Sequence, residues 1–473
     1  MVFNSFHFAV FFVVIYALYR SVSHRSQNWV LLLASYYFYA SWDWRFLVLL
    51  LASTGIDYVC AIVIDRREDP RERKQALVVS LGFNLLMLGF FKYFNFFAGS
   101  LQTLLRSAGV EADYATLNIV LPVGISFYTF MTMSYVIDVY RRDIPPCRNL
   151  RDFALFVAYF PHLVAGPILR ADWLLRQIAR PRRIGADQVR DALWLLIWGF
   201  FKKVFVADNL AHVADAVFNR SGPAGGFEVL IGVYAFAFQI YGDFSGYSDI
   251  ARGTSLLMGI ELNVNFRFPY FVRSATAFWQ HWHISLSTWL RDYLYIPLGG
   301  SRVGSARTKR NLAITMLLGG LWHGAAWTYV LWGAYQGVLL MAFRTGAEWL
   351  DRRPQRWVDK PWARVAGVLI MFHLTCYGWL IFRAHSVGQI LSFTASLVGA
   401  GVSSPPVVVA YAWQVLFFAG PLVLFHGYEA WRDDLKAIFT MRPAARYAIC
   451  LALCYVIVLW GEFGGGEFIY FRF

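Results

Sequence analysis

Apolar residues run along most of this chain in blocks, and short polar or basic segments separate the blocks. Crossing about 30 Å of hydrocarbon takes a helix of roughly 17–25 residues. Candidate membrane segments are predicted at 6–19, 29–40, 46–64, 76–97, 119–139, 153–169, 192–206, 229–241, 312–342, 365–382, 407–424 and 447–460. The pattern predicts an all-α, polytopic integral membrane protein with roughly 11–12 transmembrane or re-entrant helices.

Several of these blocks are short or contain helix-breaking residues. Pro122 and Gly124 interrupt one block, Pro161 and Gly166 another, and the 312–342 block is long enough for one broken helix or two short ones. Broken helices at membrane depth are tolerated where they line a cavity or are buried in protein. We therefore expect an internal site within one membrane-embedded domain, residues 1–473, since neither a linker nor an internal repeat is visible.

The composition agrees with a membrane protein, because 58% of the residues are hydrophobic and 15% are charged. The net charge of +14 comes from basic residues in short loops at 66–74, 141–151 and 170–183. Such loops are typically cytoplasmic, which places the N-terminus outside and requires 153–169 to dip in and return on the same side. The basic segments 66–67, 71–74, 141–142, 148–151 and 180–183 lack interleaved aromatic residues, so nucleic acid is not expected. The five cysteines show no metal-ligand spacing, so no metal site is expected.

Residues 278–294 sort into two faces on a helical wheel. Trp279, Trp282 and His283 share an apolar and aromatic face, opposite a polar face. The pattern predicts one amphipathic helix that lies at an interface or re-enters the protein. His283 is then either a hydrogen-bonded core residue or part of a substrate channel.

Residues 239–253 are dense in polar groups beside an apolar block. The candidate residues in this stretch are Gln239, Tyr241, Asp243, Ser245, Asp249 and Arg252. One interpretation is a polar loop with internal salt bridges, and the other is a wall of a reaction chamber. Gly242 and Gly246 permit close approach of backbones. Ser245 does not sit in a nucleophile elbow, because the flanking glycines of that motif are replaced by Asp243 and Tyr247.

His323 lies within the apolar 312–342 block, in the stretch Leu321–Gly324. A charged residue at the centre of a membrane helix costs about 2.5–3.5 kcal/mol, so a titratable group there suggests function. Burial disfavours imidazolium, and a neutral ring acts as a general base worth about 10²–10⁴-fold in rate. Acyl transfer from a thioester to an alcohol needs such a base in a water-poor place. The alternative is that His323 only hydrogen-bonds two helices together.

Five stretches together resemble a known family. They are 121–141, 243–253, 278–300, 322–337 (which contains Trp322-His323-Gly324) and 468–473. They are similar to the membrane-bound O-acyltransferase family, in its bacterial branch that modifies polysaccharides. The resemblance implies a ring of helices around a central tunnel. It implies His323 as the catalytic base and His283 as a second catalytic residue. It implies a substrate tunnel formed by Trp322, Trp279, Trp282, Gln239, Tyr241, Asp243, Ser245, Asp249 and Arg252.

The same resemblance implies the reaction and its surroundings. An acetyl group would pass from a cytosolic thioester, acetyl-CoA, across the bacterial inner membrane to an exported, alginate-like polysaccharide, with no bound cofactor. The expected partners are the lipid bilayer, a periplasmic acetyltransferase and the exopolysaccharide machinery. Three alternatives stay open: D-alanyl transfer to teichoic acid from a carrier protein, a non-enzymatic transporter, and a structural subunit of an exopolysaccharide complex.

Overall fold

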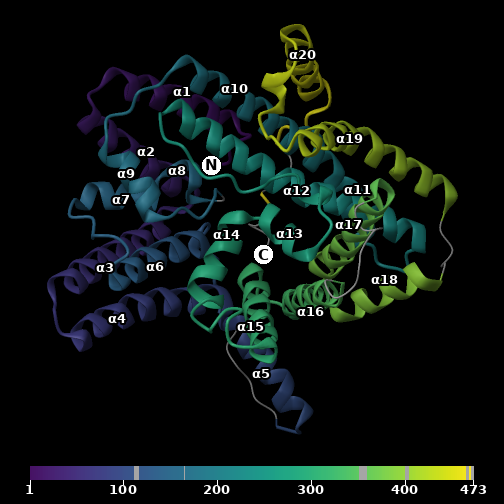
Figure 1. The fold of residues 1–473 in the computed structure, drawn as a ribbon, viewed down its shortest axis with the longest axis horizontal. Coiled ribbons are helices and arrows are strands. Elements are labelled where there is room, and N and C mark those ends of the chain that lie inside the picture. The colour runs from purple at the N-terminus through teal and green to yellow at the C-terminus, as the bar shows by residue number, and fades with distance from the viewer. Residues whose placement is uncertain (111–116, 165, 351–359, 400–403, 465–467, 470–473) are drawn as a thin grey trace. The chain divides into compact units, whose positions relative to one another are not determined.

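The computed structural model describes residues 1–110, 117–164, 166–350, 360–399, 404–464 and 468–469. Most of these residues lie in helices, and no strand occurs among them (Figure 1). The all-α prediction is therefore confirmed. The chain divides into two compact units, residues 1–192 with 251–263 and residues 193–250 with 264–473.

The first unit contains the N-terminal helices. They are α1 (Phe6–Ser21), α2 (His24–Asp43), α3 (Leu47–Arg66), α4 (Pro70–Leu88), α5 (Phe94–Ser107), α6 (Ile125–Arg141), α7 (Leu150–Ala158), α8 (Phe160–Leu163) and α9 (Ala171–Ala179), followed by α10 (Ala186–Phe200), which crosses into the second unit. Asp57 of α3 is fully buried and accepts hydrogen bonds from Ser80 at 2.6 Å and Asn84 at 3.0 Å, both on α4. A polar group inside an apolar helix is thus paired within the protein, as burial requires.

The second unit holds the remaining helices. They are η3 (Phe201–Ala207), α11 (Asp208–Phe218), α12 (Gly226–Leu257, up to residue 250), η4 (Pro269–Phe271), α13 (Ala275–His281), α14 (Ile284–Leu290), η5 (Arg291–Tyr295), α15 (Ser305–His323), α16 (Trp327–Leu350), α17 (Pro361–Arg383), α18 (Val387–Gly399), α19 (Pro405–Arg432), η6 (Ala437–Thr440) and α20 (Pro443–Trp460). η3 and η5 are π-helices, a form that is frequent at functional sites.

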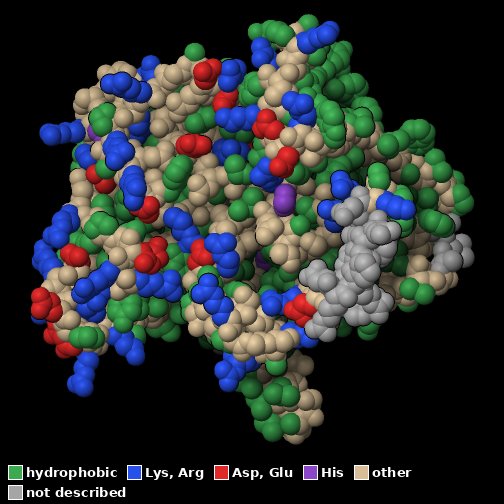
Figure 2. Space-filling model, in the orientation of Figure 1, with side chains coloured by type: hydrophobic (Ala, Val, Ile, Leu, Met, Phe, Trp, Pro, Cys, Tyr) green, Lys and Arg blue, Asp and Glu red, His purple; other side chains and the backbone are tan. Residues whose placement is uncertain are grey.

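Six helical segments among the described residues are long and apolar enough to cross a membrane. They are His24–Arg66, Pro70–Ser107, Gly226–Leu257, Pro361–Arg383, Pro405–Arg432 and Pro443–Trp460. Large apolar side chains such as Leu424, Leu451 and Val458 are exposed on these helices, and hydrophobic side chains cover the visible surfaces of α5 and α20 in Figure 2. Such surfaces are expected to face hydrocarbon rather than water.

Most predicted segments coincide with helices. The interruptions predicted at Gly124 and Gly324 are confirmed, whereas Gly319 and Gly320, which were also expected to interrupt a helix, lie inside α15. The 312–342 block is two helices, α15 and α16, separated at Gly324–Ala326. Likewise, α6 begins only after Gly124, whose φ of 75° is a left-handed conformation that glycine adopts readily. The apolar helix α18 was not predicted.

Two sequence predictions about local structure are wrong. Residues 239–253 are not a polar loop, because they lie inside the long helix α12, and the buried lysines of η3 pair with its carboxylates. Residues 278–294 are not one helix. Their chain breaks at Trp282 and His283 between α13 and α14, because both side chains are buried and the backbone turns to bring them inward.

Candidate active site

His323 is the last residue of α15, directly before the break that leads to α16. The two helices pack closely through Gly320 and Gly333: a Cβ atom on Gly320 would lie 3.0 Å from the Gly333 Cα. A Cβ atom on Gly324 would collide with the Tyr329 ring. These glycines let the two backbones approach, which fixes the position of the His323 ring.

His283 occupies the break between α13 and α14. Its φ of 43° and ψ of 53° are left-handed, a conformation that costs a residue with a side chain roughly 1–2 kcal/mol. Asn265 holds this break. Its backbone carbonyl accepts the Ile284 N–H at 2.9 Å, and its Oδ1 accepts the Ser285 N–H at 3.2 Å and the Ser285 hydroxyl at 2.9 Å. Asn265 therefore caps α14 from outside the helix and fixes where His283 points.

The structure brings the two predicted catalytic histidines together. The ring centroids of His283 and His323 are 6.3 Å apart, and their side chains are 0% and 3% exposed. The predicted Trp322 lies beside both, with its ring 5.8 Å from His283 and 5.1 Å from His323. Burial, together with the neighbouring His323, lowers the pKa of His283 well below its usual range. His283 is thus neutral at pH 7.

Aromatic rings enclose this histidine pair. Trp332 and Phe382 pack edge-on against His323 at 4.9 and 5.5 Å, and Phe244 packs against His283 at 4.6 Å. Of the predicted tunnel residues, Trp279 lies one ring further out, 5.8 Å from Trp332. The indole N–H groups of Trp279 and Trp332 are buried and have no hydrogen-bond partner among the described residues.

The predicted residues of α12 have different surroundings in the structure. Gln239 is buried, and its Oε1 has no hydrogen-bond partner among the described residues. Ser245 is 1% exposed. Tyr241 lies 6.0 Å from Trp282, and its hydroxyl pairs with His426 rather than with either catalytic candidate. Arg252, although on the same helix, belongs to the first unit.

Asp243 and Asp249 of α12 are held by consecutive lysines of η3. Lys203 Nζ lies 2.7 Å from Asp243 and 2.8 Å from Asp208, while Lys202 Nζ lies 2.6 Å from Asp249. Burial, together with the nearby Asp243, raises the pKa of the Asp208 carboxyl, against the opposing effect of Lys203. The predicted close approach at Gly242 and Gly246 is confirmed, since Cβ atoms there would lie 2.8 Å from backbone oxygens of residues 202 and 199.

The C-terminal stretch also packs on α12. The Ile469 N–H donates to Asp243 Oδ2 at 2.7 Å, and the Phe468 ring lies 4.7 Å from Tyr247 and 5.7 Å from Phe244. Because Phe244 contacts His283, this stretch supports one wall of the histidine site. Residues 470–473 of the family-like stretch lie outside the described residues.

Sequence reasoning missed several residues around the site. They are Lys202, Lys203, Asn265, His426 and Glu429. The lysine pair and the spacing of His426 and Glu429 at i and i+3 were visible as polar groups in or beside apolar blocks. Nothing in the local sequence pointed to Asn265, because its partners lie about twenty residues away.

The arrangement suits proton transfer in a water-poor place. Two buried imidazoles lie side by side, ringed by aromatic side chains, at a point where two helices are interrupted. A neutral imidazole accepts a proton from a hydroxyl, and the enclosure keeps water from competing with that hydroxyl. Within the described part of the chain, no group of three His, Cys, Asp or Glu side chains could hold a metal ion.

Known proteins resemble this chain over most of its length. Residues 147–380 match the membrane-bound O-acyltransferase family. The probable alginate O-acetylase AlgI of Pseudomonas putida is 44% identical, covering 88% of this chain and 87% of its own. The peptidoglycan O-acetyltransferase of Helicobacter pylori is 34% identical, covering 79% and 74%. The teichoic acid D-alanyltransferase of Bacillus subtilis is 26% identical, covering 56% and 69%. On this similarity, the chain belongs to the membrane-bound O-acyltransferase family.

Proposed function

We propose that this membrane O-acyltransferase transfers an acetyl group from a cytosolic thioester to an exported, alginate-like polysaccharide. The observation that carries the proposal is the buried pair of imidazoles, 6.3 Å apart between their ring centroids. The 44% identity with the probable alginate O-acetylase supports acetyl as the group and alginate as the acceptor class. Identity falls to 26% for the D-alanyltransferase, which makes D-alanyl transfer the second candidate.

His323 acts as the general base in this proposal. Its neutral ring takes the proton from the acceptor hydroxyl as the hydroxyl oxygen attacks the thioester carbonyl. The new oxygen–carbon bond forms, the carbon–sulfur bond breaks, and the imidazolium returns the proton to the leaving thiolate. His283, buried beside it, orients the reacting groups, and the surrounding Trp322 and Trp332 rings exclude water.

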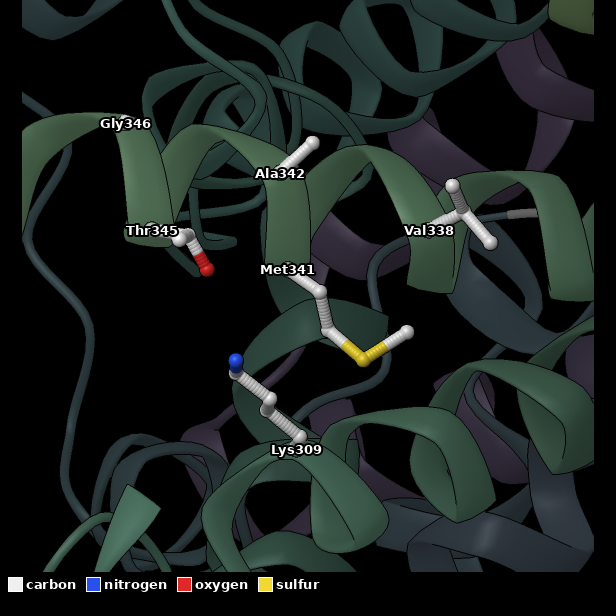
Figure 3. Close-up of a pocket in the computed structure, with 6 residues that line it drawn as sticks. All are labelled: Lys309, Val338, Met341, Ala342, Thr345 and Gly346. Atoms are coloured by element: carbon white, nitrogen blue, oxygen red, sulfur yellow. The ribbon is translucent and has the colours of Figure 1, made fainter. Parts of the chain in front are cut away.

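The donor is proposed to enter beside the N-terminal end of α15. There, Lys309 faces Val338, Met341 and Thr345 of α16 across a cavity of about 720 Å³, and its amino group points into the open space (Figure 3). Lys309 precedes His323 by fourteen residues on one helix, or roughly 21 Å at about 1.5 Å per residue. An ammonium group suits the phosphates of acetyl-CoA.

The basic residues near this cavity support a cytosolic location. Residues 302–310 carry Arg302, Arg307, Lys309 and Arg310 without an acidic residue. Short loops of this kind are typically cytoplasmic. The proposed setting is the bacterial inner membrane, with the N-terminus outside and a periplasmic acetyltransferase and the exopolysaccharide machinery as partners.

Replacing His323 tests the proposal directly. The variant His323→Ala is expected to reach wild-type abundance in the membrane and to lose acetyl transfer from acetyl-CoA by about 10²-fold or more. The matched control is His281→Ala, since His281 lies two residues from His283 but its ring hydrogen-bonds the Ala277 carbonyl of its own helix. Mass spectrometry of the exported polysaccharide identifies the acyl group. Wild-type acetyl content with His323→Ala would refute the base, and D-alanyl esters in place of acetyl esters would favour the second candidate.

A further inference from the structure

A second cavity lies in the same unit, and neither His283 nor His323 lines it. It has a volume of about 250 Å³, and residues of α12, η4, α17 and α19 line it. Its walls are mainly aromatic and aliphatic and include Phe238, Phe372, Leu422 and Val423. Sites for drug-sized ligands usually occupy about 300–1,000 Å³, so this pocket suits part of a chain rather than a whole cofactor.

The polar groups in the pocket wall are already used within the protein. Three tyrosines line it, and each hydroxyl has a protein partner: Tyr234 with His373 at 2.8 Å, Tyr241 with His426 at 2.9 Å, and Tyr270 with the Ala237 carbonyl at 2.6 Å.

The one histidine of the wall is engaged on both ring nitrogens. His426 Nε2 pairs with Tyr241, and Nδ1 lies 2.5 Å from Glu429, which is 1% exposed. With these bonds made, the wall presents ring faces and aliphatic groups to the cavity. A ligand that offered hydrogen bonds would find few free partners there and would lose its hydration.

The position of the pocket indicates where its ligand comes from. The helices α12, α17 and α19 are all among the six that are long and apolar enough to cross a membrane. At the edge of the pocket, Leu369 and Val423 are 53% and 37% exposed. Exposed apolar side chains on such helices face hydrocarbon, so the pocket opens toward lipid tails.

We propose that this pocket binds one acyl chain of a bilayer phospholipid, which inserts between α17 and α19 and packs against the Tyr241 and Tyr270 rings. Moving an acyl chain from the bilayer into an apolar pocket gains no hydrophobic free energy, so packing and shape decide whether the chain binds there. The expected result is therefore selective occupancy of this pocket, rather than tight binding of a soluble ligand.

Photo-crosslinking tests the proposal on the full chain. The protein is placed in nanodiscs of phosphatidylethanolamine that carries a diazirine on one acyl chain, and the labelled peptides are mapped by mass spectrometry. The lipid is expected to label the peptides that contain Leu369, Phe372 and Val423 more strongly than the exposed surface of α20.

Two variants fill the pocket from its edge, namely Val423→Trp and Leu369→Trp. Either is expected to reduce labelling of the pocket several-fold. The control Leu424→Trp adds the same ring one residue away, on a side chain that is 77% exposed and does not line the pocket. Size-exclusion profiles identify any variant that fails to fold.

Three outcomes would overturn the proposal. They are unchanged labelling in both filled variants, even labelling of all exposed apolar surfaces, and suppression of the labelling by acetyl-CoA. The last would assign the pocket to the acyl donor. Because the readout is labelling and not acetyl transfer, the result does not depend on the proposed polysaccharide or on His323.

Discussion

Lys203 forms ion pairs with two buried carboxylates, and its replacement tests how this unit is held together. Its Nζ lies 2.8 Å from Asp208 and 2.7 Å from Asp243, and all three side chains are nearly inaccessible. In Lys203→Met a side chain of similar length keeps most of the packing but leaves both carboxylates without a cation.

The expected loss follows from the cost of an unpaired buried charge. Breaking a buried ion pair by removing one partner typically destabilises by about 3–5 kcal/mol. Two carboxylates share the ammonium here, but we do not expect twice that cost. The pKa of the Asp208 carboxyl is already raised, so it takes up a proton instead of remaining charged. A loss of about 3–5 kcal/mol corresponds to roughly a 10²- to 10⁴-fold change in an equilibrium constant.

Thermal unfolding in detergent, followed by fluorescence size-exclusion, measures this effect. Lys203→Met is expected to lower the midpoint strongly. The double variant Lys203→Met/Asp208→Asn is expected to recover part of the loss, because an amide at position 208 needs neither a cation nor the uptake of a proton. The control Lys74→Met replaces an exposed lysine of α4 and is expected to stay within about 0.5 kcal/mol of the parent. An unchanged midpoint in Lys203→Met, or no recovery in the double variant, would refute the reasoning.

Three further predictions concern the site and its supports. Asn265→Ala removes the acceptor of two buried donors of Ser285 at a cost of about 1–3 kcal/mol, so both the thermal midpoint and acetyl transfer are expected to fall, and to fall less in Ser285→Ala. Equal behaviour of the two variants would argue against the cap. Asp208→Asn tests a pH effect. Because the pKa of Asp208 is raised in the folded protein, this carboxyl contributes stability that is complete below its unfolded pKa of about 3.9 and is lost as the pH rises through its folded pKa. The thermal midpoint of the variant is therefore expected to decline less than that of the parent between about pH 4 and 8. Parallel pH profiles would contradict that shift. Lys309→Gln is expected to raise the KM for acetyl-CoA several-fold with little change in kcat, measured from initial rates, and an unchanged KM would remove Lys309 from the donor site.

The sequence alone determined the fold class and the family of this protein. Apolar blocks of membrane length predicted an all-α chain, and the glycines of the 312–342 block predicted that it is broken, because hydrophobic periodicity and glycine conformation are local properties that a chain carries in any fold. The motif around Trp322–Gly324 predicted the family, which the comparisons with known proteins confirmed.

The tertiary structure alone decided the geometry of the site. Local periodicity favoured one helix over 278–294, whereas Asn265 and the burial of Trp282 and His283 break it and place His283 beside His323, forty residues away. The same holds for α12. Its carboxylates favoured a polar loop on sequence grounds, whereas in the structure Lys202 and Lys203 pair with them inside a helix. Contacts between residues far apart in sequence offset the free-energy cost of a left-handed backbone and of buried charge. The order of neighbouring residues does not predict such contacts.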